Sequence, residues 1–337
     1  MRPAAKGAGA TPASAAPAAR CLLCEGPLRP WMTIDGDHRR PADRRAFRLY
    51  WCDACDLGQL QPRPSQAEAD AFYDIRYCTH VTDEEAAASS GAERSLLGRL
   101  RVRLAWAVDR GTHLDAALVH HLLGGKPSDV LDLGCGNGGL LAALRERGHR
   151  GVGVEPDPVA RGMAAARGLD VRAGHADAPP ATLPPGGFDA VLLAHVLHLC
   201  LDPLGVLVRA RALLRPGGLL VCEVVNNHAR GLERAGDCWR WLDIPRHLTL
   251  LTRSSLSRLC VRAGLEPVRL DFGGYTRQFK RAWIEDEAQK RATLHPSRPG
   301  TAAGHALGAW GLLARTAFAP PEQKYDSVRI VARAPSR

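Results

Sequence analysis

The stretch that most constrains the fold runs from Asp129 to Leu140 and reads DVLDLGCGNGGL. A short apolar run containing one acid ends in a glycine-rich loop between Gly134 and Gly139, and a helix-like pattern follows. Glycines at this spacing let the backbone turn tightly and approach a ligand closely. A strand, a glycine loop and a helix in this order predict the first unit of a ligand-binding α/β sheet. The loop alone does not identify the ligand.

Strand-like and helix-like segments alternate from this point onward. Predicted strands cover residues 130–133, 151–155, 169–173, 188–196, 219–225, 265–272 and 327–332. Predicted helices follow the glycine loop to about residue 147 and cover 158–167 and 203–214. This alternation predicts a doubly wound, mostly parallel α/β sheet that binds its ligand at the carboxyl ends of the strands.

Four cysteines near the N-terminus form two C-x2-C pairs separated by 27 residues: Cys21, Cys24, Cys52 and Cys55. Two such turns facing each other supply four sulfurs in the tetrahedral arrangement that structural zinc favours. Four thiolates leave no open coordination position, so we expect a structural zinc ribbon. A redox-active C-x2-C would explain only one pair. The other six cysteines are expected to be small core residues.

Composition narrows the class of protein. The first 20 residues are rich in Ala and Pro, lack the apolar centre of a signal peptide, and predict a disordered tail. No apolar run approaches the ~20 residues that span a bilayer, so we expect a cytoplasmic protein without membrane contact. The net charge is +10, but only five of the 45 basic residues are lysine and the arginines are spread along the chain. Nucleic-acid binding is therefore possible but not favoured.

Three acids near the predicted strand ends constrain the ligand. Glu155, at the end of the second strand, can accept hydrogen bonds from ribose hydroxyls, as it would in an NAD-binding enzyme. Asp132, however, lies inside the strand before the glycine loop, where it suits an ammonium group and would repel a dinucleotide pyrophosphate. Asp177, beyond the third strand, can meet an adenine amino group. Asp132 thus argues against an NAD oxidoreductase.

With these residues in order, the sequence resembles the class I S-adenosylmethionine-dependent methyltransferases. The matching stretches are VLDLGCGNGGL, GVGVEPDP, GHADA, FDAVLLAHVLHLCLDP and LLRPGGLLVCEV. The cysteine pairs, LQPRPS…FYDIRY and DCWRWLDIPRHLTLLTRSSLSRLCVRAGL further resemble the subgroup with an N-terminal zinc-binding module. The resemblance covers roughly residues 21 to 272 and the final strand. Where the subgroup commonly reads V-L-E-H, this chain has Val196-Leu197-His198-Leu199, so the Glu–His pair is absent.

The resemblance implies a cofactor, S-adenosyl-L-methionine, and a set of cofactor-binding residues. They are Asp132, Gly134, Gly136, Glu155, Asp177 and Ala194. Asp132 and the Gly134 backbone would face the amino-acid end of the cofactor, while Glu155 and Asp177 would hold ribose and adenine.

The sequence gives fewer indications of the residues that bind the methyl acceptor. In DIPRHLTLLT, His247 is the first candidate for a general base, and His195, at the end of the predicted fourth strand, is the second. Arg246 would offer a fork for an anionic acceptor group. Tyr73 and Tyr77 are expected either to form a lid or to dock the ribbon on the core.

These observations predict the following organisation: a tail (1–20), a zinc-ribbon module (21–62), a helical linker or lid (63–125), the cofactor-binding core (126–272), a helical insertion (273–324), and a final strand with a tail (325–337). The expected function is methylation at oxygen or carbon of a small-molecule or carrier-bound acceptor. Two alternatives stay open. One is an rRNA or tRNA methyltransferase whose zinc ribbon contacts RNA, and the other is a catalytically idle cofactor-binding partner protein.

Overall fold

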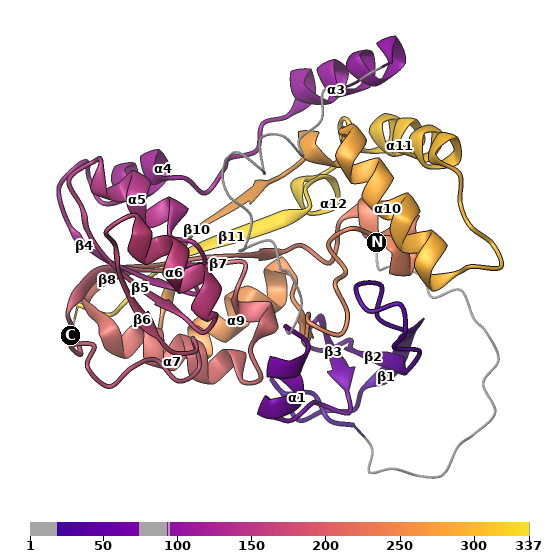
Figure 1. Ribbon diagram of the computed structural model, residues 1–337. Helices are drawn as coiled ribbons and strands as arrows, with labels where there is room; N and C mark the ends of the chain where they lie inside the picture. The colour runs from indigo at the N-terminus through magenta and orange to yellow at the C-terminus, as the bar shows by residue number, and fades with distance from the viewer. Residues whose placement is uncertain (1–18, 74–92, 94, 337) are drawn as a thin grey trace.

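The computed structural model describes residues 19–73, 93 and 95–336 (Figure 1). The first 18 residues of the expected tail and Tyr77 of the expected lid lie outside this part of the chain. Within it, the strands form a seven-stranded sheet and a four-stranded sheet.

The larger sheet is the expected α/β core. In spatial order its strands are β10 (Glu266–Gly273), β11 (Ser327–Arg333), β8 (Leu214–Val225), β7 (Phe188–Ala194), β4 (Asp129–Leu133), β5 (Arg150–Glu155) and β6 (Asp170–Ala173). The strands from β8 to β6 are parallel, and only β11 runs antiparallel to its neighbours. The predicted doubly wound, mostly parallel sheet is confirmed.

Helices cover both faces of this sheet. On one face, α4 (Ala116–Leu122) packs against α5 (Gly139–Arg145), and on the other α7 (Pro203–Leu213) packs against α9 (Arg253–Arg262). Successive side chains of β4 point to opposite faces of the sheet. Val130 packs in the apolar cluster beneath α4 and α5, and Leu131 packs in the apolar cluster beneath α7 and α9. This alternation is the two-residue period of a strand buried on both sides. A further helix, α6 (Pro158–Ala166), packs on β5 and β6.

The smaller sheet contains β1 (Arg29–Asp35), β2 (Ala46–Cys52) and β3 (Leu57–Gln61), all antiparallel. A fourth strand, β9 (Thr249–Leu250), pairs with β3 although it comes from the far part of the chain. After the sheet, Ser65 caps α1 (Gln66–Ala71) in a reciprocal capping box with Glu68. The cysteine module thus shares its sheet with a strand of the core region, and the domain boundaries proposed from the sequence remain a prediction.

The region after β10 contains four helical elements in the described part of the chain. It contains η4 (Thr276–Phe279), α10 (Arg281–Leu294), α11 (Ala302–Thr316) and α12 (Pro321–Lys324). Of these elements, η4 and α11 pack against α3 (Leu96–Val108), which extends away from the sheet in Figure 1. The loop after β8 adds α8 (Arg230–Ala235) and η3 (Gly236–Cys238), and η2 (Leu197–Leu199) follows β7. Among the described helices, none combines the length and the apolar character needed to cross a membrane.

Candidate functional site

The glycine loop after β4 has the backbone conformation that only glycine adopts without strain. Gly134, Gly136 and Gly138 have φ angles of +81°, +56° and +75°. A Cβ on Gly134 would lie 2.4 Å from Cγ2 of Val196, so the loop passes directly against the segment that follows β7. The N–H of Gly136 donates to Oε2 of Glu155 at 2.9 Å, which ties the loop to the end of β5. The structure therefore brings the predicted residues of β4 and β5 together.

Asp132 lies at the base of this loop with an unsatisfied oxygen. Its side chain is buried, and among the described residues Oδ1 has no hydrogen-bond partner. Burial, with the negative charge of Glu155, raises the pKa of Asp132 to about 7. Burial also raises the pKa of Glu155. The backbone N–H groups of Asp157 and Gly136 stabilise the ionised form of Glu155 and oppose this effect, but burial is the larger influence. A buried carboxylate without a donor suits a ligand that brings a positive charge.

The other two predicted cofactor residues lie at the same edge of the sheet. Ala194 is the last residue of β7, and Asp177 follows β6 as a half-buried side chain in a tight turn closed by the bridge between His175 and Ala178. The carboxyl ends of β4, β5, β6 and β7 thus contribute the whole predicted set.

His195, directly after β7, is held in an unusual backbone conformation. Its φ angle is +59°, a value that non-glycine residues adopt infrequently and that concentrates at functional positions. Its backbone N–H donates to the carbonyl oxygen of Glu223 at 2.8 Å, and its Nε2 lies 3.1 Å from Oε1 of the same residue. The second carboxylate oxygen of Glu223 accepts from Arg329 at 3.0 Å.

The electrostatics of this pair favour an ionised glutamate. Burial alone would raise the pKa of Glu223, but the hydrogen bond and charge of His195, with the charge of Arg329, bring it below its usual value. Glu223 can therefore compensate a positive charge that develops on the His195 imidazole.

An aromatic stack holds the same imidazole from the side. The rings of His195 and Trp241 lie 5.2 Å apart at an interplanar angle of 11°, and the guanidinium of Arg277 lies 4.9 Å from the Trp241 ring centre. Nδ1 of His195 has no hydrogen-bond partner in the described part of the chain. Nε2 is engaged by Glu223, so Nδ1, which is buried in this structure, is the ring nitrogen without a partner among the described residues.

His247, the first candidate from the sequence, lies deeper. Its ring contacts His198 at 4.4 Å, and the His198 ring lies 6.1 Å from that of His195. His247 is only 3% exposed, and burial lowers its pKa to about 3, helped by the charges of Lys290 and Arg246. Its assignment as a base remains a prediction, and its position favours His195 as the group nearer to a ligand.

Arg246 does not have the role that its sequence position suggested. It is fully buried, with Nε donating to Asp243 and Nη1 donating to Asp37, each at 2.9 Å. Arg246 is therefore part of an internal ion-pair network that joins the loop after β1 to the segment before β9. The expectation that it meets an anionic acceptor group is wrong, because its donors already bind two carboxylates.

The four N-terminal cysteines converge as expected. Their sulfurs lie within 4.8 Å of one another, and those of Cys24 and Cys52 are 3.6 Å apart. The residue after each cysteine pair, Glu25 and Asp56, has a left-handed φ of +58° and +56°, which turns the backbone around the sulfurs. Four sulfurs at this separation suit a tetrahedral metal ion.

The sequence reading gave no role to Glu223, Arg277 or Arg329. One signal was present: Glu223 is a lone acid in the middle of the apolar run LLVCEVV. A carboxylate in a buried strand needs a partner, and the partners here are His195 and Arg329.

Comparisons with known proteins agree with this architecture. Residues 108–270 match the family model of a methyltransferase domain. The ubiquinone biosynthesis O-methyltransferases of Dinoroseobacter shibae and Cereibacter sphaeroides are 34% and 35% identical over 149 residues, which is 41% of this chain and 60% of each relative. The chain thus matches these curated relatives over about three fifths of their length.

Two solved structures are similar at lower identity. The first is 1,6-didemethyltoxoflavin-N1-methyltransferase of Burkholderia thailandensis, with a TM-score of 0.46, 18% identity, and coverage of 86% of this chain and 96% of that one. The second is geranyl diphosphate C-methyltransferase of Streptomyces coelicolor A3(2), with a TM-score of 0.43, 17% identity, and coverage of 65% and 74%. The family match and the strand order of the sheet together show that residues 108–270 contain a class I S-adenosylmethionine-dependent methyltransferase domain.

Proposed function

We propose that this protein transfers a methyl group from S-adenosyl-L-methionine to an oxygen or carbon atom of a small-molecule or carrier-bound acceptor. The observation that carries the proposal is the His195–Glu223 pair, held at 3.1 Å beside the glycine loop. The similar curated proteins are named as O-methyltransferases, which favours oxygen as the methylated atom.

The residues at the strand ends fit this cofactor. Asp132, with its unpartnered oxygen, would accept from the ammonium of the cofactor's amino-acid end, next to the backbone of Gly134 and Gly136. Glu155 would hold the ribose, Asp177 the adenine amino group, and Ala194 would line the site from β7. The bound cofactor supplies an electrophilic methyl on a sulfonium, so the protein's task is to align the acceptor and to remove a proton.

His195 would be the proton acceptor. In the neutral tautomer with hydrogen on Nε2, it donates to Glu223 and keeps a lone pair on Nδ1, where no other described residue competes. When the oxygen of an acceptor hydroxyl displaces the cofactor's thioether from the methyl carbon, Nδ1 would take the hydroxyl proton and Glu223 would stabilise the resulting imidazolium. His247 remains the second candidate, and from its buried position it would act through His198.

The cysteine module would hold one structural zinc ion through Cys21, Cys24, Cys52 and Cys55. With all four positions filled by sulfur, such an ion takes no part in methyl transfer. Its effect would be on the fold, because β3 of the module pairs with β9 of the core region.

Two measurements test this proposal. Calorimetry should detect binding of S-adenosylhomocysteine by the purified protein, with NAD bound far more weakly. Incubation with methyl-labelled cofactor and cell extract, followed by separation into RNA, protein, lipid and small molecules, should place label in the small-molecule or carrier fraction. The His195→Ala protein serves as the matched control and should transfer little label.

The remaining outcomes discriminate the alternatives. Label in RNA would favour an rRNA or tRNA methyltransferase. Cofactor binding without transfer to any fraction would favour a catalytically idle partner protein. Absence of S-adenosylhomocysteine binding would overturn the proposal.

A further inference from the structure

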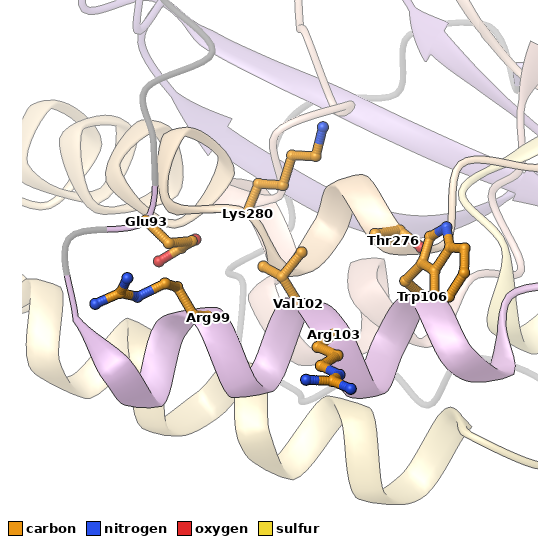
Figure 2. Close-up of a pocket in the computed structure, with 7 residues that line it drawn as sticks. All are labelled: Glu93, Arg99, Val102, Arg103, Trp106, Thr276 and Lys280. Atoms are coloured by element: carbon orange, nitrogen blue, oxygen red, sulfur yellow. The ribbon is translucent and has the colours of Figure 1, made fainter.

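Two neighbouring cavities lie between α3 and η4, outside the cofactor residues. Their volumes are about 430 Å³ and about 660 Å³, and both are lined by Trp106, Thr276 and Lys280. Figure 2 shows the first, with Lys280 across the cavity from Val102 of α3. The buried Arg101 of α3 donates to the carbonyl oxygen of Phe279 at 3.0 Å, so the two walls are fixed to each other by an internal contact.

Cationic side chains outnumber acids around these cavities. The lining cations are Arg99, Arg103, Arg110, Arg277 and Lys280, and the lining acids are Glu93 and Asp109. Arg99 and Arg103 stand four residues apart on α3 and so project from the same face of the helix. Both are exposed, as is Lys280.

The two acids already have partners. Glu93 accepts from the backbone N–H of Arg281 at 2.6 Å and lies 3.6 Å from the guanidinium of Arg101, which is not part of either cavity lining. Asp109 accepts from the backbone N–H groups of Gly111 and Thr276 and from the Thr276 hydroxyl. Among the cations, Arg277 donates to the carboxylate of Asp326 at 2.8 Å, so its charge is compensated as well. The other lining cations, Arg99, Arg103, Arg110 and Lys280, leave the cavities with a positive charge.

Two side-chain contacts link the wall of the larger cavity to His195. Its wall includes Arg277, whose guanidinium lies over Trp241, and Trp241 in turn stacks on His195. Both Thr276 and Arg277 follow β10, which ends at the same edge of the sheet as β7. A molecule lying along this wall would reach from the arginines of α3 toward His195.

From this arrangement we propose that the methyl acceptor carries a phosphate group. The phosphate binds between Arg99 and Arg103 of α3 and Lys280, and the part to be methylated extends past Arg277 and Trp241 toward His195. The indole of Trp106, which borders both cavities, provides an apolar surface between the two ends. This inference rests on the proposed function for the position of the reacting end, whereas the anion site itself does not depend on it.

The test uses inorganic pyrophosphate as the probe, measured by calorimetry at low salt in the full-length protein. The informative variant is Arg99→Gln/Arg103→Gln. The control is Arg209→Gln/Arg211→Gln, which removes the same charge from exposed positions on α7. Two lost charge-assisted hydrogen bonds should weaken binding at least about tenfold in the first double variant and leave it unchanged in the control. Affinity for S-adenosylhomocysteine should be the same in all three proteins.

Several results would overturn the inference. They are no pyrophosphate binding by the unmodified protein, equal weakening in both double variants, or tighter binding of succinate than of pyrophosphate. Much tighter binding of an RNA oligonucleotide, lost in Arg99→Gln/Arg103→Gln, would replace the small phosphorylated acceptor with RNA. Loss of S-adenosylhomocysteine binding by the unmodified protein would instead overturn the proposed function and leave the pyrophosphate result standing.

Discussion

His195 and Glu223 make two separate contacts across the junction of β7 and β8. The imidazole Nε2 meets the carboxylate at 3.1 Å, and the His195 backbone N–H meets the Glu223 carbonyl at 2.8 Å. The second contact fixes the backbone at a left-handed φ, and the first fixes the ring. Together they aim Nδ1 in one direction before any ligand binds, which is the preorganisation that a general base requires.

We therefore expect His195→Ala to lower turnover on the true acceptor by about 10²–10⁴-fold, the usual contribution of a positioned base. Affinity for S-adenosylhomocysteine should change little, because no predicted cofactor contact is removed. Glu223→Gln should keep the ring in place but destabilise the imidazolium. Its turnover should fall less than that of His195→Ala, with a shifted pH profile. Full activity of His195→Ala would contradict the assignment.

His247→Ala tests the deeper histidine. If His247 acts through His198, turnover should fall less than in His195→Ala, while cofactor affinity stays nearly unchanged. Steady-state kinetics of His195→Ala, His247→Ala and the double variant would measure the coupling, since residues that act as one unit give non-additive losses. A larger loss of turnover in His247→Ala than in His195→Ala would instead identify His247 as the main candidate for the base, as the sequence suggested.

Cofactor affinity should depend on pH through Asp132. The ionised carboxylate binds the ammonium group, and with a pKa of about 7 in the cofactor-free protein it is mostly protonated at pH 6. Affinity for S-adenosylhomocysteine should thus be about tenfold weaker at pH 6 than at pH 8. Asp132→Asn should bind weakly at both pH values without this dependence. Asp177→Asn, which removes a carboxylate from the same sheet edge, should weaken binding but keep it.

Removal of zinc should loosen the small sheet before the large one. We expect one zinc per chain by elemental analysis and its loss in Cys52→Ser, with the matched buried variant Cys260→Ser retaining the metal. Hydrogen exchange in β1, β2 and β3 should accelerate at least about tenfold after chelation, because metal binding and folding of such a module are coupled. A metal-free protein with unchanged exchange would show that the cysteines serve another purpose.

Arg246→Leu should destabilise the protein strongly. It would leave the buried carboxylates of Asp37 and Asp243 without their shared cation, a loss of about 3–5 kcal/mol for a broken buried pair. Thermal or urea unfolding would measure this against Arg209→Leu, which removes an exposed arginine from α7. If Arg246→Leu left the stability unchanged and weakened binding of the acceptor, the original expectation that Arg246 binds the acceptor would be supported.

The parts of the molecule that follow from local sequence were predictable. The glycine loop could be recognised from residues 129–140, and the cysteine cluster from a fixed ligand spacing. The start of the strand β8 differs from the prediction because of contacts with other strands. We expected the strand to begin at residue 219, but β8 begins at Leu214. Arg215 within the extension is paired with Asp129 and Asp189 on β4 and β7.

What could not be predicted depends on contacts between distant parts of the chain. The pairing of β3 with β9 and the burial of Arg246 against Asp37 join residues about 190 and 209 positions apart. The sequence DIPRHLTLLT is the same whether its histidine faces a ligand or is buried. In this structure the histidine is 3% exposed and packs against His198. The local pattern of His247 therefore carried no information about its depth.

The shared sheet of β3 and β9 limits how the protein can be divided. Phe47, Leu49 and Trp51 of the cysteine module belong to one apolar cluster with Trp239 and Leu242 of the segment before β9. A shortened chain beginning at residue 63 would keep every predicted cofactor residue, yet it would bare this apolar surface and the unpaired edge of β9. Exposed edges and patches of this kind promote aggregation. An engineer who transplants the module to another methyltransferase must move residues 239–250 with it.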